Sequence, residues 1–189
     1  MSRGLAFVLV FVAAAAGCSS TDNTANSEAM EAYLGLDSSV EKALDLAFVG
    51  INNAVTENIG PGTLGGDAKG TLVVAGQIDQ GTGLTKTVRV DASYNGYSDD
   101  GAAIYTTDPA SPPLLTLEVS YQDGSLTGRY LGQFTMSGAL AGPLTLDIAI
   151  NGYVQSAGKT GGIERAPYST QIHGTAVSDY GSYLVDFTR

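Results

Sequence analysis

Residues 125–140 read Ser125-Leu-Thr-Gly-Arg-Tyr-Leu-Gly-Gln-Phe-Thr-Met-Ser-Gly-Ala-Leu140, and they alternate between two kinds of side chain. Apolar residues and glycines share one parity, and mostly polar residues take the other. At about 3.3 Å per residue, this alternation predicts a single strand about 50 Å long. A straight strand of that length would overrun a small domain, so we expect the inner-face glycines to let it bend. The segment therefore favours a rolled sheet or a closing barrel.

The same period of two recurs in other parts of the chain. It is clearest in residues 87–95, 115–122 and 144–151, where apolar and polar side chains alternate. Such alternation is typical of antiparallel strands with one buried and one wet face. Asp123-Gly124 predicts a tight hairpin, and the three prolines of residues 108–113 predict a loop.

An internal similarity indicates related β-hairpins. Residues 70–78 resemble 132–140, residues 90–97 resemble 146–153, and residues 174–187 form a faint third copy. Chance similarity in a chain rich in Gly, Val and Thr is the alternative explanation. Three hairpins together with the segment 102–122 predict about eight strands.

One amphipathic helix is predicted, from Ser38 to about Asn58. Ser38-x-x-Glu41 has the pattern of a capping box at a helix start, and Gly60-Pro61-Gly62 is expected to end the helix. Apolar residues at helical spacing form its dry face: Val40, Leu44, Ala47, Phe48, Ile51 and Val55.

These patterns predict a mainly β fold: a strongly curved antiparallel sheet or barrel of about eight strands, with one N-terminal amphipathic helix packed on it. Alternation also occurs in transmembrane barrels, with apolar residues outward. A helix with one dry face needs an apolar surface to cover within its own domain. This favours a sheet with the helix packed on it over a transmembrane barrel. We expect residues 35–189 to form this single β-rich domain.

The first residues have the organisation of an export signal. Arg3 is followed by an unbroken apolar stretch over residues 5–16 and then by Gly17 and Cys18. Twelve apolar residues span about 18 Å as a helix, which is short of the roughly 30 Å hydrocarbon core. A cleaved signal peptide is therefore favoured over a membrane-spanning helix.

Ala15-Ala16-Gly17-Cys18 resembles the lipobox of bacterial lipoproteins, with Ala15 where that class usually has Leu. The resemblance implies a diacylglyceryl group on the Cys18 sulfur, cleavage between Gly17 and Cys18, and acylation of the new amino terminus, for example with palmitate. It divides the N-terminal region into a signal peptide, 1–17, and a polar, flexible tether, 18–34. Ser19 after the cysteine favours the outer membrane over the inner one. An ordinary signal peptide ending near a cysteine is the alternative.

Composition excludes several function classes. The formal net charge is −10 and the few basic residues are scattered, which argues against a nucleic-acid partner. One His and one Cys cannot form a Cys/His zinc site. Segment 98–101, Ser-Asp-Asp-Gly, lacks the full pattern of a calcium loop and reads better as a turn. The single imidazole, His173, has no suitably spaced nucleophile, so we predict no catalytic residue, cofactor or metal, and no enzyme.

Five tyrosines in or just after strands are the candidate ligand-lining residues: Tyr94, Tyr97, Tyr121, Tyr130 and Tyr153. Tyrosine at a strand end can line a cavity with an apolar ring and a polar tip. Two hypotheses follow for a membrane-anchored envelope lipoprotein. In the first, the curved sheet encloses an apolar or amphipathic ligand, such as a lipid, glycan or peptide. In the second, the core is filled and the protein has a structural or protein-interaction role.

Overall fold

The fold is a curved antiparallel sheet with one long helix along its inner side. The computed structural model describes residues 21–79, 81–158 and 161–189. The chain forms helix α1 (Thr21–Asn53), then β1 (Asn58–Gly65), β2 (Lys69–Ile78), β3 (Thr85–Ser98), β4 (Ala103–Thr106), β5 (Leu114–Ser120), β6 (Ser125–Gly138), β7 (Gly142–Ser156), β8 (Ile163–Arg165), β9 (Gln171–Ser178) and β10 (Gly181–Thr188). The predicted mainly β class is confirmed.

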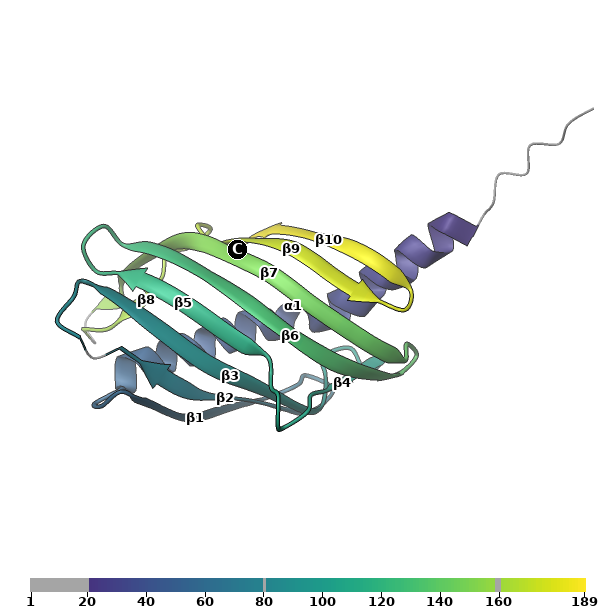
Figure 1. The fold of residues 1–189 in the computed structure, drawn as a ribbon, viewed down its shortest axis with the longest axis horizontal. Helices are drawn as coiled ribbons and strands as arrows, with labels where there is room; N and C mark the ends of the chain where they lie inside the picture. Colours follow the sequence, from purple (N-terminus) through teal and green to yellow (C-terminus); the bar gives the residue numbers. More distant parts are fainter. Residues whose placement is uncertain (1–20, 80, 159–160) are drawn as a thin grey trace, which may run out of the picture.

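The strand order bends the sheet around the helix. It runs β1-β2-β3-β4-β6-β7-β9-β10, with β5 pairing β3 and β6, and β8 pairing β7. The long strands β6 and β7 cross the whole sheet, and α1 runs behind them on the concave side (Figure 1). Both edge strands, β1 and β10, contact α1. Within the described residues these two edges do not pair with each other, so the sheet curls into an open ring that the helix fills.

The inner faces of the strands and the dry face of α1 form one core. On β6 the predicted parity is confirmed, because Leu126, Tyr130, Phe134 and Met136 are buried. On α1, the predicted dry-face residues from Val40 to Ile51 are buried as well. Burying these side chains removes apolar surface from water, which is the main favourable term in folding.

The inner-face glycines of β6 make room for close neighbours. A Cβ at Gly132 would lie 2.3 Å from Cβ of Pro113, and one at Gly128 would lie 2.6 Å from Cδ2 of Leu117. The side chains of β5 and the residue before it therefore lean over these two positions. The sequence analysis explained these glycines by the bending of the strand. The structure adds a steric reason, because a Cβ at either position would clash with a neighbouring residue.

Three predictions about the helix are wrong. Helix α1 begins at Thr21, so residues 21–34 of the expected flexible tether are helical, and Ala29 and Tyr33 among them are buried. Tyr33 stacks on Tyr183 and Phe187 of β10, which attaches the helix to the sheet upstream of the expected capping box. Residues 1–20, which include the predicted signal peptide, lie outside the described residues.

The capping box itself is the second error. Ser38 lies inside α1 and its hydroxyl donates to Asp99, while Glu41 accepts from Arg165. Third, the helix ends at Asn53, and Val55 beyond it is 96% exposed. The residues that resemble a helix start are instead contacts between the helix and the sheet.

The described residues form ten strands, rather than the predicted eight or so, because β1 and β8 were not foreseen. Gly60-Pro61-Gly62 lies within β1, where the pairing with β2 is irregular between Ile59 and Gly62. A proline is tolerated there because β1 is an edge strand. Strand β8 has three residues, which is too short to show a period.

The three predicted hairpins form as β2–β3, β6–β7 and β9–β10. Their registers differ, however. In the first hairpin, Ile78 pairs with Val88. The repeat makes Leu140 and Leu144 the equivalent residues of the second hairpin, but Leu144 pairs with Phe134 instead. The similar segments therefore both form hairpins, but the two hairpins do not share one strand register.

Candidate functional site

The structure separates the five predicted tyrosines into two groups. Tyr94, Tyr97 and Tyr130 are buried in the core beneath α1. Tyr121 and Tyr153 are on the surface, with 46% and 60% of their area exposed. The five side chains therefore do not line one common cavity.

Two buried tyrosines connect the sheet to the helix through their hydroxyls. Tyr94 and Tyr130 share a hydrogen bond of 2.9 Å between hydroxyl oxygens, and the Ser39 hydroxyl on α1 donates to Tyr94 over 3.2 Å. Burial raises the pKa of Tyr94 to about 12. Tyr105 adds a third link, because its hydroxyl donates to the Ala32 carbonyl over 2.8 Å. These hydroxyls form hydrogen bonds with the helix or with each other, so they stabilise the contact between the helix and the sheet.

The acidic segment at residues 98–101 forms a turn around Asp100. Asp100 Oδ1 accepts the backbone N–H groups of Ala102 and Ala103 at 2.8 and 3.3 Å. In the described part of the chain, no group of three or more His, Cys, Asp or Glu side chains is placed to hold a metal ion. The interpretation of this segment as a turn agrees with its hydrogen bonds.

Asp99 at the end of β3 accepts several donors at once. Lys42 on α1 donates over 2.7 Å, Tyr97 donates over 2.7 Å to either oxygen, and the Asp67 N–H donates over 3.0 Å. The Ser38 hydroxyl donates as well. Burial alone would raise the pKa of Asp99, but these hydrogen bonds outweigh it and hold the pKa below its usual value. Asp99 thus binds one side of the helix as a carboxylate.

The other side of the helix is held by arginines. Asp37, Glu41 and Asp45 are spaced four residues apart on α1 and so share one face. Arg165 of β8 donates to Glu41 over 2.6 Å and to Asp45 over 3.0 Å, and Arg189 donates to Asp37. Ionic contacts therefore flank α1 on both sides.

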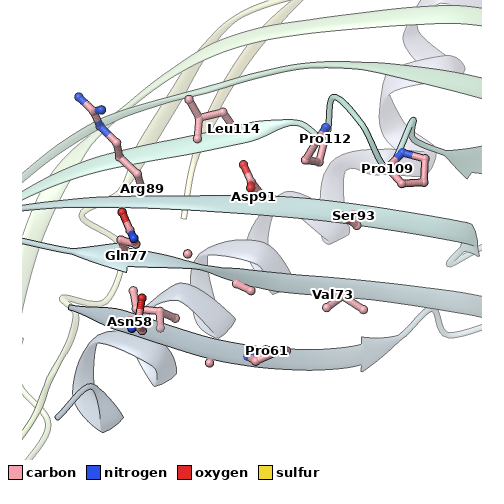
Figure 2. A pocket seen from close by; sticks show the side chains of 14 residues that line it. Asn58, Pro61, Val73, Gln77, Arg89, Asp91, Ser93, Pro109, Pro112 and Leu114 are labelled. Carbon is pink, nitrogen blue, oxygen red and sulfur yellow. The ribbon is translucent and has the colours of Figure 1, made fainter. Parts of the chain in front are cut away.

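The convex face carries an open groove across β1, β2 and β3 (Figure 2). Its volume is about 760 Å³. The side chains or backbone of these residues line it: Asn58, Ile59, Gly60, Pro61, Val73, Ala75, Gly76, Gln77, Arg89, Asp91, Ser93, Pro109, Pro112 and Leu114. The loop after β4, which contains the predicted prolines, forms one wall.

Residue size explains why this groove exists. Ala75 and Gly76 on β2 and Ser93 on β3 are small and lie between larger neighbours. Pro61 on β1 and Pro112 in the loop lie on opposite sides of Ser93 in the close-up (Figure 2). The small side chains leave the groove deep between its two sides. The sides are rigid, because the proline ring fixes the φ angle of the backbone.

The guanidinium of Arg89 in this groove has no ion-pair partner among the described residues. Arg129, Arg165 and Arg189 each form an ion pair with a carboxylate. Arg89 is exposed and forms none within the residues that the structure describes. An unpaired guanidinium presents a fork of donors that suits carboxylate or phosphate groups. Asp91 follows on the same face of β3, so the groove presents both charges.

Sequence reasoning placed Arg89, Asp91 and Ser93 on the wet face of their strand, but it did not predict the groove. Its walls come from β1, which was not foreseen, and from a loop whose position is set by tertiary packing. His173, the single imidazole, lies on the outer face of β9 opposite Ala149 and Asp186. Its imidazole makes no hydrogen bond among the described residues.

Comparison with known proteins finds no match: no family model, curated protein or solved structure resembles the chain significantly. Among the described residues, no helix combines the length and apolar character that a membrane span requires.

Proposed function

We propose that the protein is a lipid-anchored protein of the bacterial cell envelope that contacts other envelope components through the convex face of its sheet, without catalysis. The anchor would be the acylated Cys18, most readily in the outer membrane. This is the second of the two sequence hypotheses, with a structural or protein-interaction role and a filled core.

The observation that carries the proposal is the packing of α1 along the concave face. A ligand enclosed by the sheet would have to displace a helix that is held by buried tyrosine hydroxyls, by Asp99 and by Arg165. The convex groove, in contrast, is open, and it contains the Arg89 guanidinium, which has no ion-pair partner in the described part of the chain. Its volume of about 760 Å³ is within the usual range for ligand pockets.

The test is site-specific photo-crosslinking in a Gram-negative host that makes the full chain. A photoreactive residue at Ser93 in the groove should yield a defined crosslinked envelope component. The control position is Thr145, on the outer face of β7 and outside the groove. Equal crosslinking at both positions, or none at either, would contradict an interaction site in the groove.

Native mass spectrometry of the protein extracted from the same host separates the two hypotheses. Under the proposal, the mass corresponds to the processed and acylated chain alone. A small apolar ligand that stays bound after extraction would instead support the enclosed-ligand hypothesis.

A further inference from the structure

A second cleft lies on the outer face where β6, β7 and the start of β9 meet. Its volume is about 360 Å³, and its lining is Ser125, Leu126, Thr127, Asn151, Gly152, Tyr153, Ser169 and Gln171. None of these residues carries a charge. The cleft shares no lining residue with the groove of Figure 2, so it is a separate feature of the surface.

A row of polar side chains crosses three adjacent strands in this cleft. Thr127 on β6 is opposite Asn151 on β7, and Asn151 is opposite Gln171 on β9. Within the described residues these three side chains make no hydrogen bond to the protein. Neighbouring strands are about 4.8 Å apart, so the row offers free donors and acceptors across about 10 Å.

Tyr153 supplies an aromatic surface beside this row. It lies on the same face of β7 as Asn151, two residues along, and 60% of its area is exposed. Its backbone is held by the turn at residues 166–169: the Tyr153 N–H donates to the Ser169 hydroxyl over 3.3 Å, and the Tyr153 carbonyl accepts the Ala166 N–H over 2.8 Å. The ring therefore projects from a fixed backbone into solvent.

The turn that holds Tyr153 contains a further exposed tyrosine. Tyr168 is 88% exposed and its φ of 56° lies in the left-handed region, which is uncommon for a residue other than glycine. Such conformations persist where the surrounding structure imposes them, and they occur often at binding sites. Here the Ser169 hydroxyl closes the turn by donating to the Ala166 carbonyl over 2.7 Å.

We propose that this cleft binds a neutral carbohydrate. The apolar face of a pyranose ring would pack on Tyr153, and its hydroxyls would exchange hydrogen bonds with the amides of Asn151 and Gln171. Side-chain amides both donate and accept, as sugar hydroxyls do. Rigid tyrosine surface together with adaptable polar side chains is a common composition of recognition surfaces. The uncharged lining favours a neutral sugar over an anionic one.

The experiment measures sugar binding by isothermal titration calorimetry. The full chain is purified in a detergent without a sugar headgroup and titrated with tetrasaccharides of β-linked N-acetylglucosamine, β-linked glucose and α-linked glucose. A tetragalacturonate serves as the anionic comparison. We expect saturable binding of at least one neutral tetrasaccharide and none of tetragalacturonate. Failure of all three neutral probes, or preferential binding of the anionic one, would overturn the proposal.

Variants assign any binding to the cleft. Tyr153→Ala should weaken the affinity by roughly tenfold or more, whereas Tyr153→Phe, which keeps the ring, should stay close to the wild type. Tyr121→Ala is the matched control, because Tyr121 is an exposed tyrosine that does not line this cleft. Unchanged binding by Tyr153→Ala in a variant with native circular dichroism would contradict the assignment. Cys18→Ala should bind the sugar like the wild type, so this test is independent of the membrane anchor.

Discussion

At Gly132, the absence of a side chain is required by the neighbour that leans over it. A Cβ there would lie within 2.3 Å of Pro113. Gly132→Val should therefore lower the free energy of unfolding by roughly 1–3 kcal/mol, in the range for overpacking, although valine favours strands. A denaturant melt measures this, with Thr135→Val on the outer face of β6 as the control. An unchanged or higher midpoint for Gly132→Val would mean that Pro113 moves aside easily.

Asp99 makes stability depend on pH in a defined direction. Its folded-state pKa is lowered, so the carboxylate stabilises the fold fully above the unfolded-state pKa of about 3.9. This contribution is lost as the pH falls through the lower folded-state pKa. We expect Asp99→Asn to be less stable than the wild type at neutral pH, and the difference to shrink in acid. A difference that stays constant from neutral to strongly acidic pH would contradict this role.

Single residues also show the limits of sequence reasoning. The parity of β6 was predictable because alternation reports directly which side chains face the core. The bonds of Ser38 and Glu41 were not, since a capping pattern and a pair of tertiary contacts use the same residue types. Tyr153 was foreseen as a candidate from its place near a strand end, but the pairing of its neighbours Asn151 and Gln171 depends on strand register.

At the scale of elements, helix α1 acts as part of the core of the sheet. Phe48 is 5% exposed, so Phe48→Ala should cost about 3–5 kcal/mol of the free energy of unfolding. Val49, its neighbour on the wet face, is 54% exposed, and Val49→Ala should change stability little. Thermal or denaturant melts of the two variants check this. Equal effects would indicate that the helix is only loosely attached.

The helix start and strand β1 were missed for one physical reason. Both are stabilised by contacts with distant parts of the chain, and local patterns do not report such contacts. Residues 21–34 look polar, yet Tyr33 stacks on Tyr183 and Phe187 with ring centroids 5.6 and 5.9 Å apart. Likewise, Gly60-Pro61-Gly62 has turn chemistry, but an edge position lets it extend as a strand.

At the scale of the whole molecule, the proposed lipid anchor at Cys18 has the most direct test. Cys18→Ala should release the protein from membranes and remove the mass increment of the attached lipid, because the acceptor sulfur is absent. Membrane fractionation and intact-mass measurement of the full chain check both effects. Retention of the variant in the membrane fraction to the same extent as the wild type would contradict a lipid anchor at Cys18.

The position of α1 also determines how the molecule would carry mechanical load. The helix has 33 residues, about 50 Å at 1.5 Å per residue, and it begins three residues after Cys18. Its first turns project beyond the sheet, and the rest lies against the strands (Figure 1). Tension applied at an anchored Cys18 would therefore act along the helix axis and strain the contacts of Lys42, Arg165 and the buried tyrosines together. Detachment would then require shearing many contacts at once, so the helix would carry the load between an anchored Cys18 and the sheet.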